Sequence, residues 1–181
     1  VVADSLGAIE DRIVKEKVLT WEKLYEQLEL DFADERIHLM MKNSQKYCGG
    51  GTSADKYAKL LTESFVRIVK AQKMKEGRQL VPGWFSWSRT IEYGEKVGAT
   101  PNGRRKGEPI SHGANPNPNF RRDGAVTAQS SGIASVQCGY GNTAPLQLEF
   151  DPSLKADERG VAIISNLIKS HFDMGGTLIN I

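Results

Sequence analysis

The chain has 181 residues, of which 39% are hydrophobic and 25% charged, and its formal net charge is +2. This balance is that of an ordinary folded protein and argues against a disordered tail and against a strongly basic nucleic-acid-binding protein. The N-terminus has no basic stretch leading into an apolar core, and no apolar run approaches the roughly 20 residues of a membrane helix. We therefore expect no targeting signal and no membrane partner.

Two cysteines, Cys48 and Cys138, stand far apart with no His or Cys at metal-ligand spacing. Neither a disulfide framework nor a metal site is indicated, and a reducing cytoplasm fits this usage best. The chain begins at Val1 without a methionine and ends in a strand-like run, which predicts an internal segment of a longer protein. We expect one partial domain, with a helical region over residues 1–77 and a strand-bearing region over residues 78–181.

The first 45 residues are predicted to form three amphipathic helices. Apolar side chains recur at helical spacing after Asp4, after Thr20 and again from Ala33 onward. Asp4 and Thr20 are of the residue types that cap helix N-termini, so a helix is expected just after each of them.

A glycine-rich loop at 49–51 precedes a fourth predicted helix. Thr52 and Asp55 have the spacing of a capping box, although Asp replaces the longer Glu, and the helix is expected to reach about Lys75. Phosphate binding by the glycines at this helix N-terminus is a weaker alternative, because the Gly-Lys-Ser/Thr ending of a P-loop is missing.

The remainder of the chain is predicted to carry strands. Residues 84–91 are rich in aromatic and β-favouring side chains and read as a strand. Farther on, a strand over 145–150, a helix over 157–173 and a strand over 177–181 form a βαβ unit. Such units place their strands parallel through a right-handed crossover, so the predicted class is α/β, a sheet or barrel with helices outside. The stripe expected to bury the helix consists of Val161, Ile164, Ile168 and Phe172.

A run of turn-forming residues lies between these parts. It reads Gly-Ala-Thr-Pro-Asn-Gly-Arg-Arg over 98–105, then Gly-Glu-Pro over 107–109 and Gly-Ala-Asn-Pro over 113–116. Pro101 presets φ for the first corner of a β-turn, Asn102 tolerates the second, and Gly103 can adopt a positive φ. A steered, ordered turn is expected here.

The order of these residues resembles a stretch of the glycyl radical enzymes, the pyruvate formate-lyase family. Members carry a similar Gly-x-Thr-Pro-(Asp/Asn)-Gly-Arg-(Arg/Lys) run, then Gly-x-Pro and, in the formate-lyase branch, Gly-Ala-Asn-Pro. The likeness extends over nearly the whole chain, since 46–49 is similar to the family's Lys-Tyr-Gly-Asn loop and 175–176 to its Gly-Gly before a strand. At 112 the chain has His where diol-dehydratase-like members have Asp.

The resemblance implies a ten-stranded parallel β/α barrel of two half-barrels, with this chain in its C-terminal half. It also implies that the full-length protein is a homodimer, in which a cysteine thiyl radical abstracts hydrogen from a small substrate and a glycyl radical stores the spin. A separate S-adenosylmethionine-dependent iron–sulfur activating enzyme would install that radical, and oxygen would destroy it.

By the same resemblance, the loops that carry the radical glycine and the catalytic cysteine lie outside this segment, so no catalytic residue and no metal ligand is expected in it. Cys48 and Cys138 are expected to be inert, and His112 is a solvated loop residue more often than an acid or base. The implied function is cleavage or dehydration of a small polar substrate by formate acetyltransferase-like, diol dehydratase-like or other lyase chemistry. The alternative is a non-catalytic half-barrel scaffold subunit or an inactive fragment.

Substrate contacts are predicted from strand parity. Alternate residues of a barrel strand face the interior, and the others face the helices. Arg89 is assigned to the interior set, because a guanidinium group beneath a packed helix would be a costly buried charge. Phe85, Trp87 and Arg89 are therefore expected to line a polar cavity. The alternative is a structural ion pair between Arg89 and Glu149, with the aromatic rings in the core.

The same alternation places Gln147 and Glu149 inward on the next strand, with its leucines against the helices. Asn180 is the polar candidate on the last strand. A basic cluster at 104–106 and 121–122 could contact nucleic acid, but acidic residues interrupt it and no stacking platform is evident. A solvated or salt-bridged loop is preferred there, and no nucleic-acid partner is expected.

Overall fold

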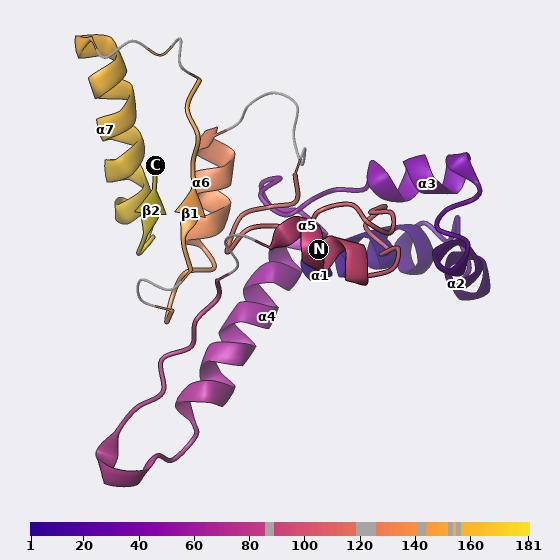
Figure 1. The fold of residues 1–181 in the computed structure, drawn as a ribbon, viewed down its shortest axis with the longest axis horizontal. Coiled ribbons are helices and arrows are strands. Elements are labelled where there is room, and N and C mark those ends of the chain that lie inside the picture. Colours follow the sequence, from indigo (N-terminus) through magenta and orange to yellow (C-terminus); the bar gives the residue numbers. More distant parts are fainter. Residues whose placement is uncertain (86–88, 119–125, 141–143, 152–153, 155–156) are drawn as a thin grey trace.

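The structure is a computed structural model, which describes residues 1–85, 89–118, 126–140, 144–151, 154 and 157–181. Within these residues the chain is mostly helical, with one two-stranded parallel sheet near the C-terminus. Helices α2 and α3 lie at one side of the molecule, the sheet with α6 and α7 lies at the other, and α4 runs away from both (Figure 1). No helix in these ranges is both long enough and apolar enough to cross a bilayer.

The three expected N-terminal helices are present. They are α1, Val2–Ile9, which continues into a π-helical turn at Glu10–Lys15; α2, Trp21–Glu29; and α3, Glu35–Lys42. The side chain of Thr20 caps α2 by accepting the N–H of Lys23 at 3.2 Å, as predicted.

The prediction that Asp4 precedes the first helix is wrong. Asp4 lies inside α1 and is 1% exposed. Its carboxylate accepts the backbone N–H of Tyr47 at 2.7 Å. A buried carboxylate needs a donor, and here a distant loop supplies it, which local sequence does not reveal.

Helix α4, Ser53–Lys70, begins with the predicted capping box. The Thr52 hydroxyl accepts the N–H of Asp55 at 3.0 Å, and the Asp55 carboxylate accepts the N–H of Thr52 at 3.0 Å. The helix ends at Lys70, before the predicted Lys75, and a short 3₁₀ turn follows at Lys75–Gly77. Helix α1 packs closely on α4.

The strand predicted over 84–91 is wrong where the structure describes it. Helix α5, Thr90–Lys96, begins within that range, and residues 84, 85 and 89 belong to no strand. Opposite charges at helical spacing make a small contribution to α5: Arg89 pairs with Glu92 at 3.5 Å, and Lys96 pairs with Glu92 at 3.1 Å. Residues 86–88 lie outside the described ranges.

The βαβ unit is confirmed. Strand β1, Leu146–Gln147, and strand β2, Ile179–Asn180, pair in parallel around helix α7, Glu158–Asp173, and both strands are shorter than predicted. The Leu146 side chain is fully buried and Leu148 is 6% exposed, which confirms the parity of this strand.

The buried stripe predicted for α7 is wrong in part. Val161 is 57% exposed and Phe172 is 48% exposed, while Ile164 and Ile168 are half-buried. A further helix, α6, Val126–Ala134, was not predicted, because its Ser- and Gly-rich sequence lacks strong apolar periodicity. Only its packing in the tertiary structure buries Ile133.

A buried polar network joins α6, α7 and both strands. The Gln137 amide donates to the carbonyls of Ala144 at 2.6 Å and Leu178 at 2.9 Å, so its oxygen is left to accept from Nε2 of His171 at 2.9 Å. Nδ1 of His171 then accepts from the hydroxyl of Ser130 at 3.0 Å. Burial lowers the pKa of His171, which keeps the ring neutral as this arrangement requires.

Candidate functional site

A polar pocket of about 510 Å³ lies at the carboxyl ends of the two parallel strands. Ligand sites in parallel sheets lie typically at these ends, because the loops that follow the strands gather there. The pocket is lined by polar side chains from the 112–115 loop, α6, β1 with its continuation, and β2: His112, Asn115, Gln129, Gln147, Glu149 and Asn180.

Asn115 substitutes for a neighbouring strand beside β1. Its amide nitrogen donates to the carbonyl of Gln147 at 2.9 Å, and its amide oxygen accepts the N–H of Gln147 at 2.9 Å. Gln129 adds a longer contact to the same carbonyl at 3.3 Å. These bonds fix the backbone of Gln147 at the floor of the pocket, and its side chain lines the pocket.

The side chains of the two strands meet across the pocket. Nδ2 of Asn180 donates to Oε1 of Gln147 at 2.9 Å, which orients the Gln147 amide. Nε2 of Gln147 is buried, and no described residue accepts its hydrogens. A buried donor without a partner costs about 1–3 kcal/mol, so this group is available to a ligand oxygen.

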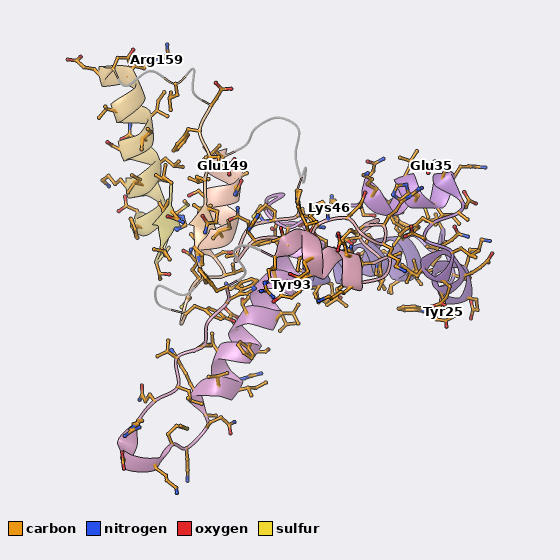
Figure 2. All side chains as sticks on the ribbon, viewed as in Figure 1. Tyr25, Glu35, Lys46, Tyr93, Glu149 and Arg159 are labelled. Atoms are coloured by element: carbon orange, nitrogen blue, oxygen red, sulfur yellow. The ribbon has the colours of Figure 1, made fainter. Side chains whose placement is uncertain are left out.

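Glu149 and His112 are exposed at the mouth of the pocket. Figure 2 places Glu149 near α6, far from Tyr25 on α2. A carboxylate and an imidazole beside four amides can orient hydroxyl groups and can accept or donate a proton.

Two of the other residues predicted to line the pocket, Phe85 and Arg89, are not among its lining residues. Phe85 is 55% exposed and lines a neighbouring, mainly apolar cavity of about 500 Å³ with Trp84, and Asn115 lines both this cavity and the polar pocket. Arg89 is 65% exposed at the start of α5 and pairs with Glu92, not with Glu149 as the alternative supposed. Its charge needs no buried counter-ion because water solvates it. Trp87 lies outside the described residues.

The turn at 98–105 forms as predicted. Gly103 adopts φ +82°, and its N–H donates to the carbonyl of Thr100 at 3.0 Å. A β-carbon on Gly103 would lie 2.4 Å from the backbone nitrogen of Lys42, so the turn packs directly on α3.

Arg104 is buried rather than solvated, which corrects the expectation for the basic cluster. It is 4% exposed, and its terminal nitrogens donate to five carbonyl oxygens of the same loop and α5. These include Glu108 at 2.8 Å and Val97 at 3.0 Å. Arg105 makes the expected salt bridge, with Glu35 of α3 at 2.6 Å.

The two cysteines differ in their surroundings, and that of Cys48 is unlike the environment of a nucleophile. Cys48 is 1% exposed and packs against α6, and burial raises the pKa of its thiol. Cys138 is a free, exposed thiol. Among the residues with described positions, no cluster of His, Cys, Asp and Glu could hold a metal ion.

Asn115 and Gln129 are pocket residues that the sequence did not single out. Asn115 belongs to the Gly-Ala-Asn-Pro run at 113–116, so its motif was recognised while its contact with Gln147 was not. Gln129 lies on the unpredicted helix α6, and no sequence signal indicated it.

Comparisons with known proteins assign the chain to a family. The family described as pyruvate formate lyase-like matches residues 1–94. Isethionate sulfite-lyase of Oleidesulfovibrio alaskensis (strain ATCC BAA-1058 / DSM 17464 / G20) is 27% identical, over 96% of this chain and 21% of the relative. Trans-4-hydroxy-L-proline dehydratase of Clostridioides difficile is 25% identical, over 97% of this chain and 22% of the relative.

A solved structure agrees with these sequence matches. The crystal structure of a glycyl radical enzyme from Archaeoglobus fulgidus superposes with a TM-score of 0.84 at 28% identity, over 99% of this chain and 23% of that chain. The chain thus spans about a fifth of the length of the relatives that it matches. It belongs to the pyruvate formate-lyase-like family of glycyl radical enzymes.

Proposed function

We propose that the chain is a segment of a glycyl radical enzyme that cleaves or dehydrates a small polar substrate, and that its polar pocket forms one wall of the substrate site. The observation that carries this proposal is the gathering of Gln147, Glu149 and Asn180 at the carboxyl ends of two parallel strands. Proteins built on parallel sheets place their chemistry there.

The β1–α7–β2 unit is proposed to be part of a ten-stranded barrel of two half-barrels, with residues 1–181 as one partial domain. Apolar side chains on two helices support this. Phe65 of α4 is 48% exposed, and Val161 of α7 is 57% exposed. Such faces fit a larger domain, whose remaining elements would cover them.

The lining of the pocket favours a hydroxylated substrate. Amides, one carboxylate and one imidazole line it, and no Lys or Arg of the described residues does. Hydroxyl groups can donate to Glu149 and accept from the free Nε2 of Gln147. We accordingly leave Arg89 out of the substrate site, and Phe85 and Trp87 stay predictions.

The radical chemistry is proposed to come from parts of the protein outside residues 1–181. There a glycyl radical, installed by a separate S-adenosylmethionine-dependent iron–sulfur enzyme, would supply hydrogen abstraction through a reactive cysteine. Buried Cys48 would then serve to pack the core, while the reactive cysteine lies elsewhere in the protein. The proposal includes a homodimeric, oxygen-sensitive enzyme of the cytoplasm, with substrate binding and orientation as the task of this segment.

The first test is the sequence of the complete reading frame. A cysteine-bearing loop upstream and an Arg-Val-x-Gly-Tyr motif downstream are expected. An intact reading frame without either would identify a scaffold subunit and refute the proposal.

The second test measures turnover by the complete, activated protein with isethionate, trans-4-hydroxy-L-proline and pyruvate as candidate substrates. Glu149→Gln and Asn180→Ala should each lower kcat/KM by about 10- to 100-fold on the substrate that is used. The glycyl radical signal in electron paramagnetic resonance should match that of the unaltered protein. Unchanged kcat/KM in both variants would remove the pocket from the substrate site.

A further inference from the structure

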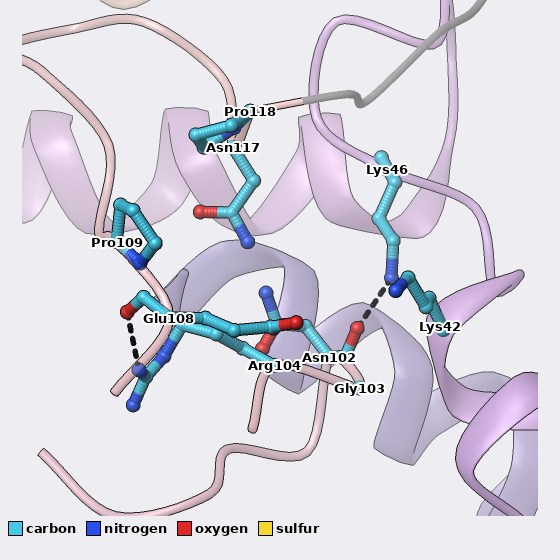
Figure 3. Close-up of a pocket in the computed structure, with 9 residues that line it drawn as sticks. All are labelled: Lys42, Lys46, Asn102, Gly103, Arg104, Glu108, Pro109, Asn117 and Pro118. Atoms are coloured by element: carbon cyan, nitrogen blue, oxygen red, sulfur yellow. Dashed lines mark hydrogen bonds between the residues drawn. The ribbon is translucent and has the colours of Figure 1, made fainter. Parts of the chain in front are cut away.

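A second polar cavity, of about 190 Å³, lies between the end of α3 and the 102–109 turn (Figure 3). It is separate from the polar pocket described above and shares no lining residue with it. At about 30 Å³ for each water molecule, this volume suits a few waters or one small ion. The side chains that matter for its chemistry are Lys42, Lys46, Asn102, Arg104, Glu108 and Asn117.

Positive charge exceeds negative charge around this cavity. Lys42, Lys46 and Arg104 face one carboxylate, that of Glu108, which already accepts the N–H of Arg105 at 3.0 Å. The terminal nitrogens of Arg104 are occupied by carbonyl oxygens, so that residue contributes charge rather than a free hydrogen-bond fork.

Lys46 directs one free donor toward the cavity. Its ammonium group donates to the carbonyls of Met41 at 3.1 Å and Asn102 at 2.8 Å, which leaves one of its three hydrogens. Burial lowers the pKa of Lys46 to about 8. The carboxylate of Asp4 opposes this shift, while Arg12 and the neighbouring Lys42 add to it. A bound anion would offset the burial and relieve the repulsion.

Two amides present nitrogen to the same space. The oxygen of Asn102 accepts the Thr100 hydroxyl at 2.6 Å, and the oxygen of Asn117 accepts the Ser111 hydroxyl at 2.9 Å, so each amide turns its NH₂ group the other way. Figure 3 shows the Asn117 amide directed toward Asn102. Asn102 is 2% exposed, and its Nδ2 has no acceptor among the described residues.

We propose that this cavity binds a small tetrahedral oxyanion of the size of phosphate or sulfate. The ammonium groups of Lys42 and Lys46 would neutralise it, and the amide nitrogens of Asn102 and Asn117 would donate to its oxygens. The buried amide donor of Asn102 and the burial of the Lys46 ammonium group each cost free energy, and one anion would offset both costs. The site would join α3 to the 98–109 turn and is independent of the substrate proposed above.

Calorimetric titration of the complete protein with sodium sulfate, and separately with sodium phosphate, tests the site at an ionic strength held constant with sodium chloride. Saturable binding is expected. Lys46→Met should weaken it by about 10-fold or more, and Lys42→Gln and Asn102→Ala by about 3- to 10-fold each. Lys73→Gln, which removes the same charge from an exposed loop at the far end of α4, should leave binding unchanged.

Three results would overturn the proposal: no saturable heat with either salt, affinities of Lys42→Gln and Lys46→Met equal to that of the unaltered protein, or an equal loss in Lys73→Gln. The last result would mean that only the net charge of the protein matters. Lys42 is exposed, so its variant should fold even if Lys46→Met does not, and circular dichroism of each variant verifies this.

Discussion

The 98–109 turn and the polar pocket are both rich in polar side chains, yet they use them differently. In the turn, the terminal nitrogens of Arg104 donate to the protein's own carbonyl oxygens, and Nδ2 of Asn102 is left without an acceptor among the described residues. In the pocket, Nε2 of Gln147 has no acceptor among the described residues, and Glu149 is exposed. Polar groups that the fold satisfies hold the structure together, whereas groups that it leaves open are those a ligand can use.

The largest effect is expected at Arg104. Arg104→Met would leave the carbonyl oxygens of Val97, Gly98 and Glu108 without a donor among the described residues, so the unfolding free energy should fall by about 3–5 kcal/mol, with little soluble protein. Chemical denaturation or thermal melting measures this loss. Arg78→Met, at an exposed arginine, is the matched control and should change stability by less than about 0.5 kcal/mol. Equal effects of the two substitutions would refute the structural role.

A smaller loss of stability is expected when a β-carbon is added at Gly103 in the turn. Gly103 and Gly107 adopt similar positive φ angles, +82° and +85°. A β-carbon added to Gly103 would collide with Lys42, whereas one added to Gly107 would meet no other atom within 4 Å. Gly107→Ala should cost about 1–2 kcal/mol through its backbone conformation, and Gly103→Ala should cost about 2 kcal/mol more. Thermal unfolding of both variants isolates the contact with Lys42. If the two variants melted alike, the turn would not pack on α3 as described.

In the polar pocket, Asn115→Ala tests whether Asn115 holds the backbone of Gln147 in place. It removes two hydrogen bonds from the backbone of Gln147, so stability should fall by about 1–2 kcal/mol and kcat/KM of the complete enzyme by about 10-fold. The kinetic loss should appear mainly in KM if Gln147 only binds substrate. Arg89→Ala, outside the pocket, should leave kcat/KM within about twofold. A larger loss in Arg89→Ala than in Asn115→Ala would reinstate the arginine as a substrate contact.

The smallest expected effect is a pH dependence of the unfolding free energy caused by the buried His171. Because burial lowers the pKa of His171 below 6.5 in the folded state, the unfolded chain takes up this proton first as the pH falls. The unfolding free energy should therefore decrease as the pH drops below about 6.5, by no more than about 1.4 kcal/mol per pH unit for one site. Denaturation curves between pH 7.5 and pH 5, compared with those of His171→Gln, isolate the contribution. Parallel pH profiles would contradict it.

Sequence alone determined the local parts of the molecule. The capping box at Thr52, the cap at Thr20 and the hydrogen bond that closes the turn at Gly103 rest on contacts between near neighbours. The order of turn residues also led to the family, which the comparisons bear out over the length of the chain. Strand alternation places Gln147 on the opposite face from the buried Leu146 and Leu148, and its role as a substrate contact stays a prediction.

Tertiary structure decided the rest. Residues 90 and 91, at the end of the predicted strand, instead begin α5, and the 98–109 turn docks on this helix, where the N–H of Gly107 donates to the carbonyl of Gly94 at 3.2 Å. Asp4 is buried by a loop 43 residues away, and Asn115 completes the pocket floor from 32 residues away. Arg89 looked like a pocket cation only while it was assigned to a strand. Contacts of this range depend on how elements pack, and neither propensity nor periodicity encodes that packing.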